Sequence, residues 1–148
     1  MRLHTGRLAL VITASLAACR SDEVLVPSPL PADSEIAVDF HTDKTQYATG
    51  ASAKTTMVNH SQNTLTMGVC NDVLERAAGA IWVEIPPPAV ACIALAVVIV
   101  PGDSATLSLD LSRATIAGTY RVFRHFSVAH GTTAETAYRR TNTFVVTR

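Results

Sequence analysis

Hydrophobic and polar positions alternate along much of this chain, in short runs that predict β-strands. In residues 35–40, Ile36, Val38 and Phe40 fall on one face of such a strand, and a period of two is typical of a strand with one buried face. Similar alternation, or a run of β-branched and apolar residues, predicts further strands at 52–59, 64–70, 81–85, 92–100, 104–111, 118–128 and 138–146.

Turn-forming residues separate these runs. Residues 43–50 are polar and end in Gly50, and Pro101-Gly102-Asp103 turns the chain between two strands. Short strands at this spacing, with turn signals between them, are typical of an all-β sandwich or barrel. We therefore predict one all-β domain over residues 35–148, an antiparallel β-sandwich of about seven to nine strands.

Two segments need a choice between structures. Residues 71–79 fit a short helix with Asp72 as its cap and Glu75 three residues on. They also fit a hairpin in which 73–76 folds back through 77–79 onto 81–85. We predict the hairpin, and the helix stays open as the alternative.

Residues 89–100 are almost wholly apolar, but twelve residues are too few to span a membrane, which takes about 20. A central strand covered on both faces is the prediction there.

The first nineteen residues have the pattern of a secretory signal. Arg2 and Arg7 precede the apolar stretch 8–18, and small residues lead to Cys19. A basic start, a short apolar middle and small residues at the cleavage point define such signals. An ordinary signal peptide with a chance cysteine is one interpretation of this pattern.

Leu16-Ala17-Ala18-Cys19 resembles the lipobox of bacterial lipoproteins. The resemblance implies that residues 1–18 are removed and that Cys19 is lipidated and becomes the mature N-terminus. Several acyl chains on one residue give stable membrane attachment, so the expected partner is a membrane, reached through a lipid anchor. The expected location is the bacterial cell envelope, with the domain outside the cytoplasm. Arg20 is not the aspartate linked to inner-membrane retention, which favours the outer membrane in a diderm cell.

Residues 19–34 follow as the lipidated cysteine and a tether. Pro27, Pro29 and Pro31 fall in this segment, and proline-rich segments stay extended.

The net charge of the mature chain limits its possible partners. Removing Arg2 and Arg7 from 12 basic residues leaves 10 against 12 acidic ones, a net charge of −2. No polybasic block is present, so we expect no nucleic-acid partner.

The mature part resembles bacterial immunoglobulin-like (Ig-like) domains over about residues 39–147. The motifs that carry the resemblance are Asp43-x3-Tyr47-x2-Gly50, Val58-Asn59, Pro101-Gly102-Asp103-Ser104 and Gly118-Thr119-Tyr120-Arg121-Val122. It is similar in particular to the type found in the intracellular proteinase inhibitor of bacilli, and to lipoproteins that carry one such domain. An Ig-like sandwich is implied, with Tyr120 in a tyrosine corner. Export and a cysteine pair set this chain apart from the inhibitor.

With Cys19 lipidated, Cys70 and Cys92 are the remaining thiols. An exported chain meets an oxidising compartment, where an even pair usually forms a disulfide. Closing a loop of 22 residues between them would contribute about 3 kcal/mol in the chain-entropy picture. We predict a structural Cys70–Cys92 disulfide.

Candidate catalytic and metal-binding groups are sparse. The chain has no Gly-x-Ser-x-Gly and no His-Glu-x-x-His sequence, and its histidines are isolated, so we predict that it is not an enzyme. Soft ligands select copper(I), and Met57, His60, Met67, Cys70 and Cys92 lie close in sequence. They form no His-x-His, Cys-x-x-Cys or Met-x-Met unit. We expect no cofactor, and copper binding is kept as an alternative.

Four arginines form the predicted anion-binding or partner-binding surface. If residues 126–138 make a hairpin, Arg124 falls nearly opposite Arg140, with Arg121 and Arg139 nearby. Facing like charges destabilise a strand pair, and a carboxylate, phosphate or acidic partner would relieve them. Alternatively, the arginines protect an exposed strand from edge pairing.

These observations favour a membrane-anchored, non-catalytic domain that binds another envelope protein or an envelope component. A proteinase inhibitor acting outside the cytoplasm is the second hypothesis. It would need an exposed loop, for which residues 130–136 are the candidate by length and polarity. A metal-handling envelope protein is the third hypothesis.

Overall fold

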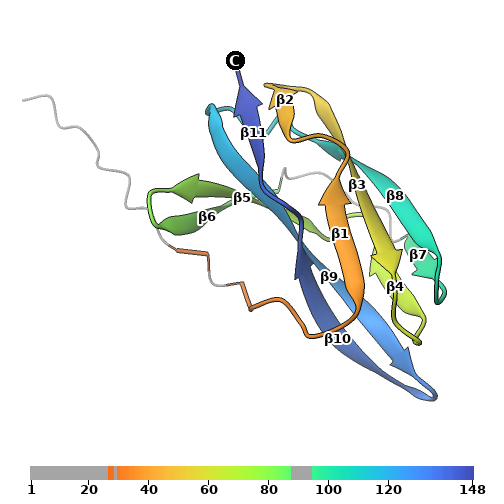
Figure 1. Cartoon of the computed structure of the whole chain (residues 1–148). Helices are drawn as coiled ribbons and strands as arrows, with labels where there is room; N and C mark the ends of the chain where they lie inside the picture. The colour runs from red at the N-terminus through yellow and green to blue at the C-terminus, as the bar shows by residue number, and fades with distance from the viewer. Residues whose placement is uncertain (1–26, 29, 88–94) are drawn as a thin grey trace, which may run out of the picture.

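The computed structural model describes residues 27–28, 30–87 and 95–148, which form a sandwich of two β-sheets (Figure 1). Sheet A consists of β1 (Val38–Thr42), β3 (Ser52–Asn59) and β8 (Ser104–Asp110). Sheet B consists of β2 (Gln46–Ala48), β4 (Leu65–Gly68), β5 (Asp72–Ala78), β6 (Ile81–Ile85), β7 (Ala96–Ile99), β9 (Gly118–His130), β10 (Thr133–Arg140) and β11 (Phe144–Thr147). The all-β prediction is confirmed, and the described part of the chain contains no helix able to cross a membrane.

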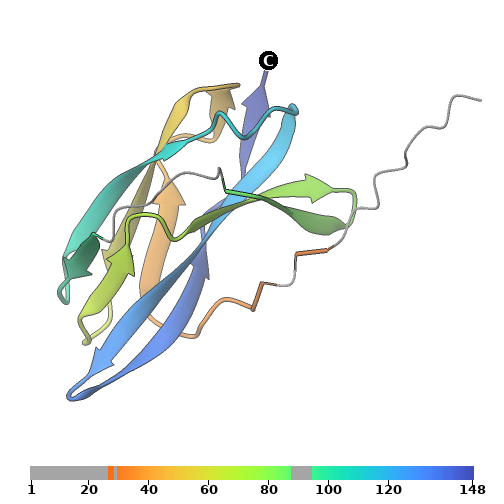
Figure 2. The same ribbon diagram turned by 180° about the vertical axis from the view of Figure 1, so that it is seen from behind.

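The long strand β9 organises sheet B. Along one side it pairs with β10 and then with β11, and along the other side with β4 and β5. β6 extends the sheet beyond β5, and β7 extends it beyond β4. The β5–β6 and β9–β10 hairpins project from the body in different directions, as both views show (Figures 1 and 2). Gly79 and Gly131 begin their two-residue turns with φ of 64° and 61°, a conformation that glycine adopts without steric cost.

The core lies between the two sheets and is lined by alternating residues from both. Met57 of sheet A and Leu65 of sheet B are fully buried. At one end the rings of Tyr47 and Tyr120 pack against Phe144, with centroids 5.3 and 6.2 Å away. These rings come from β2, β9 and β11, so they join three strands that are distant in sequence.

The described residues form eleven strands rather than the predicted seven to nine, for two reasons. Residues 43–50, predicted as a turn, contain β2, because Tyr47 turns its ring into the core. The single strand predicted at 138–146 is divided into β10 and β11. Between them, Thr141 Oγ1 accepts a hydrogen bond from Val122 N at 3.0 Å, so a side chain takes the place of a main-chain partner.

The structure decides between the two predictions for residues 71–79 and changes the prediction for the apolar residues 89–100. The hairpin is confirmed, because β5 pairs with β6 from Leu74 to Ala78, and the helix alternative is wrong. Its turn is Gly79-Ala80 and not the predicted 77–79, because Ala77 and Ala78 are paired with β6. Residues 88–94 of the predicted central strand lie outside the described residues. The described remainder contains β7, which among the described strands pairs with β4 alone and leaves Val98 60% exposed. It is therefore an edge strand, and the prediction of cover on both faces is wrong for it.

Candidate functional site: the arginine network of sheet B

The four predicted arginines lie on β9 and β10, with a register that differs by one residue from the predicted one. Arg124 pairs with Arg139, and Arg140 pairs with Phe123. Because a shift of one residue moves a side chain to the other face of a sheet, Arg124 and Arg139 face sheet A. Arg121 and Arg140 are on the outer face instead. The prediction that Arg124 and Arg140 face each other is therefore wrong.

On the outer face, Arg121 and Arg140 enclose a buried carboxylate. The side chain of Glu75 is 0% exposed, and its Oε2 accepts hydrogen bonds from Arg121 Nε at 2.8 Å and Arg140 Nε at 3.0 Å. The two guanidinium groups also lie over aromatic rings, Arg121 over Trp82 at 3.9 Å and Arg140 over Phe123 at 4.8 Å. We call these five residues the outer cluster.

Electrostatics in the outer cluster favour ionised Glu75. Burial raises the pKa of this carboxyl, but hydrogen bonds and charge from Arg121 and Arg140 outweigh the burial and hold the pKa below its ordinary value. Two cations facing one carboxylate leave a positive charge. Asp33 balances it, because Asp33 Oδ1 accepts a hydrogen bond from Arg140 Nη1 at 2.8 Å.

On the inner face, Arg124 is part of the core. Its side chain is 0% exposed, and Asp72, directly opposite on β5, accepts hydrogen bonds from its Nε and Nη2 at 2.5 Å. Nη2 also donates to Thr55 Oγ1 on sheet A at 3.1 Å. The guanidinium lies over the Phe40 ring at 4.6 Å. Arg124 thus connects the two sheets, and no part of it is open to an external anion.

Arg139, the fourth arginine, is held by main-chain carbonyls. Its Nε donates to Val38 O at 3.0 Å and its Nη1 to Ser34 O at 3.3 Å. The chain's own carboxylates and carbonyls therefore contact all four arginines. The sequence had suggested that an external carboxylate, phosphate or acidic partner would make these contacts. The sequence offered no signal for the contacts within the chain, since Asp33, Asp72 and Glu75 are distant from the arginines along the chain.

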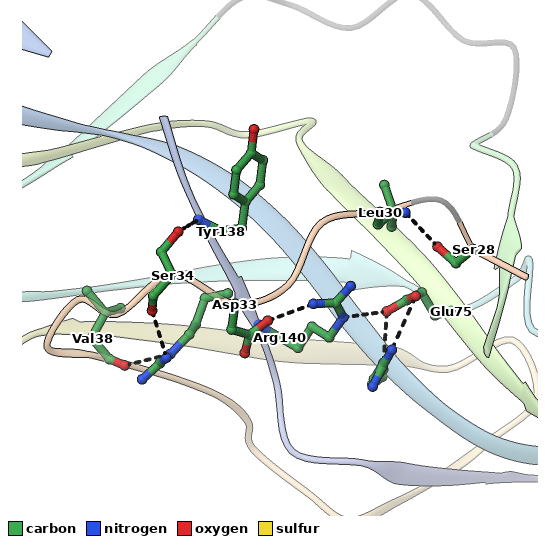
Figure 3. A network of polar contacts seen from close by, with 10 residues as sticks. Ser28, Leu30, Asp33, Ser34, Val38, Glu75, Tyr138 and Arg140 are labelled. Carbon is green, nitrogen blue, oxygen red and sulfur yellow. Dashed lines mark hydrogen bonds and ion pairs between the residues drawn. The ribbon is translucent and has the colours of Figure 1, made fainter. Parts of the chain in front are cut away.

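The described part of the predicted tether is docked on sheet B. We call the described residues of segment 27–34 the strap. At one end, Ser28 N donates to Trp82 O on β6 at 2.8 Å. At the other end, Ser34 exchanges hydrogen bonds with Tyr138 on β10, each of 2.9 Å. Between them Asp33 joins the outer cluster through Arg140 (Figure 3). The strap is thus bonded at its two ends to β6 and β10, and between them to Arg140 of the outer cluster.

Two motif tyrosines have structural roles. Tyr120 Oη donates to Ile116 O at 2.5 Å, which confirms the tyrosine corner. Tyr47 Oη donates to Asp43 Oδ1 at 2.7 Å, and Lys54 N donates to the same oxygen at 2.8 Å. These hydrogen bonds lower the pKa of the Asp43 carboxyl, the one from Tyr47 most. The Asp43-x3-Tyr47 motif therefore ties β2 to β3.

The remaining predicted sites fall partly outside the described residues. Cys19 and Cys92 lie there, and Cys70 follows β4 in a turn, so the lipidation and the disulfide stay predictions. Among the suggested copper ligands, Met57 and Met67 are buried in the core. No three His, Cys, Asp or Glu side chains of the described ranges gather as a metal site.

The candidate inhibitory loop is a regular hairpin. β9 ends at His130 and β10 begins at Thr133, so only Gly131 and Thr132 are unpaired in segment 130–136. His130 Nε2 lies 3.0 Å from Glu135 Oε1 across this hairpin. The segment therefore has no extended loop that a protease cleft could hold.

Comparison with known proteins gives a family match and matches to 28 chains of solved structures. A model of the bacterial Ig-like domain family matches residues 34–143. The crystal structure of a beta-glucosidase from Listeria innocua in complex with gluconolactone is 13% identical, with a TM-score of 0.32. The match covers 73% of this chain, which spans 16% of that enzyme's chain. No curated protein matches the sequence.

Proposed function

We propose that this chain, which belongs to the bacterial Ig-like domain family, is a lipid-anchored envelope protein whose domain binds another envelope protein without catalysing a reaction. Cys19 holds the protein to the membrane, and the sandwich meets the partner outside the cytoplasm. The motif Leu16-Ala17-Ala18-Cys19 supports the anchor, together with the basic and apolar residues before it.

The exposed edge of β7 is the observation that supports partner binding. Leu95, Val98 and Val100 are 57%, 60% and 49% exposed on this edge, and no charged residue occurs from position 85 to 102. Natural edge strands usually carry charges, prolines or bulges that prevent pairing. An edge without charge suits the addition of an extended strand from a partner, in which main-chain hydrogen bonds give affinity.

Mass spectrometry of the mature protein tests the anchor. We expect the N-terminal peptide to begin at Cys19 and to carry acyl chains, and a Cys19→Ser variant to lose them and to leave the membrane fraction. An unmodified N-terminal peptide, or membrane association that survives in Cys19→Ser, would contradict the anchor.

Site-specific photo-crosslinking in cells tests the binding edge. A photoreactive amino acid at Val98 should give a discrete adduct with one envelope protein. The matched control places the same group at Ser108, an exposed residue of β8 on the other sheet. Val98→Lys should abolish the adduct formed from a probe at Val100. Equal adducts from positions 98 and 108, or an adduct that survives Val98→Lys, would refute binding through β7.

A further inference from the structure

We propose that the β5–β6 hairpin contacts the surface of the membrane that holds the lipid anchor. This inference rests on the proposed lipidation of Cys19 and adds an orientation to it. The strap runs from the β5–β6 hairpin to β1 (Figure 1), and Ser28 is bonded to Trp82 on β6. The strap therefore begins beside this hairpin.

The length of chain between anchor and strap limits the distance. Eight residue steps separate Cys19 from Pro27, and even a fully extended chain of that length spans at most about 29 Å. If the tether were free up to Ser34, seven further residues would increase this reach and leave the orientation open. Because the strap is docked, the hairpin is the part of the domain held nearest to the lipid.

The chemistry of the hairpin suits a lipid headgroup region. No charged residue occurs from Ala77 to Val83, and Gly79 and Ala80 at the turn are exposed. Trp82 follows, partly exposed, with the Arg121 guanidinium 3.9 Å from its ring. Tryptophan is enriched at membrane–water interfaces because its ring is apolar and its N–H is polar. The β9–β10 hairpin differs, since it carries His130, Thr132 and Glu135 around its turn. It also projects in another direction (Figures 1 and 2).

The polar contacts of the strap would maintain this orientation. Asp33 contacts Arg140 through Nη1 at 2.8 Å and through the main-chain N at 3.2 Å. Arg140 in turn contacts Glu75 at 3.0 Å. A cation at position 33 would face Arg140 and repel it, which should release the strap without touching the core.

Fluorescence quenching by lipid tests the orientation, because Trp82 is the sole tryptophan of the chain. The lipidated protein is placed in vesicles of phosphatidylethanolamine and phosphatidylglycerol, with or without brominated lipid. We expect brominated lipid to reduce Trp82 emission. The variant W82F/T132W, which moves the tryptophan to the β9–β10 turn, should show no reduction. D33K should float with the vesicles and lose the quenching, whereas the control D103K should keep it.

The outcomes separate this inference from the proposed function. Flotation with the vesicles reports the anchor, and quenching reports the orientation. A protein that floats while Trp82 is quenched no more than the tryptophan of W82F/T132W refutes the orientation alone, as does undiminished quenching in D33K. A protein that fails to float refutes the anchor, and the orientation with it. Circular dichroism of each variant verifies that the β-sandwich is intact.

Discussion

Replacing Asp72 by asparagine would remove the carboxylate that neutralises Arg124 inside the core. The guanidinium is 0% exposed and the carboxylate 9% exposed, so solvent cannot replace the lost charge at Arg124. The amide would keep the shape of the side chain and one acceptor oxygen. The change therefore isolates the charge of the pair from the packing around it.

The expected loss follows from the burial of the pair. Removing one partner of a buried ion pair destabilises a protein by about 3–5 kcal/mol. Arg124 keeps its hydrogen bond to Thr55 and its position over Phe40, which places Asp72→Asn near the lower limit, about 3 kcal/mol. Small domains are stable by about 5–15 kcal/mol, so the loss would be a large fraction of the total.

Urea unfolding of the mature protein, followed by Trp82 fluorescence and by circular dichroism, measures this loss. The matched control is Asp110→Asn, at an exposed carboxylate of β8 that accepts hydrogen bonds from Ser112, which should move the unfolding midpoint far less because solvent reaches the site. The double variant Asp72→Leu/Arg124→Met should recover stability relative to Asp72→Asn, because it leaves no buried charge unpaired. If Asp72→Asn moves the midpoint no more than Asp110→Asn does, the pair does not hold the two sheets together.

Three further predictions concern the Tyr120 hydroxyl, the Glu75 carboxylate and the predicted disulfide. Tyr120→Phe removes the hydroxyl bonded to Ile116 and should lower the free energy of unfolding by about 1 kcal/mol, measured by urea unfolding; an unchanged midpoint would contradict it. The pKa of Glu75 in the folded protein lies below its ordinary value of 4.5, so the stabilisation by its carboxylate is complete above that pH and is lost as the pH falls through the lowered pKa. Glu75→Gln should therefore reduce the dependence of the free energy of unfolding on pH in the acid range. An equal dependence in both proteins would refute this. Non-reducing peptide mapping should find Cys70 joined to Cys92, and reduction should destabilise the domain by about 3 kcal/mol; free thiols at both positions would contradict the proposed disulfide.

The strand pattern could be predicted well from the sequence because strands with one buried face repeat every two residues. Val38 and Phe40 were placed on the buried face of one strand, and both are in the core. β2 was missed because of its length. β2 has only three residues, too few for a period to show, and its place depends on the Tyr47 hydroxyl reaching Asp43.

The arginine network could be predicted only in part. The sequence indicated that charges gather on β9 and β10, but it contained no information on which carboxylates meet them. Those contacts join residues 46 to 107 positions apart. The register error between Arg124 and Arg140 arose because the turn at Gly131 has two residues, fewer than the polar segment around it suggested. The docking of the strap was missed because proline spacing predicts an extended chain and not its neighbours.

The ion pairs of sheet B specify the register of β5 on β9. Asp72 lies directly opposite Arg124, and Glu75 directly opposite Arg121, so the two pairs are on opposite faces of the same strand pair. A slip of β5 by one residue would move Asp72 and Glu75 to the opposite faces, away from the arginines that they contact. A slip of two would set Asp72 against Val122 or Phe126 and leave a buried charge unpaired, at a cost of several kcal/mol. The alternation of apolar and polar positions alone distinguishes such a slip less sharply, because a shift of two residues keeps every side chain on its own face. The buried charges therefore select one alignment, and through Arg140 and Asp33 that alignment fixes the place where the strap docks.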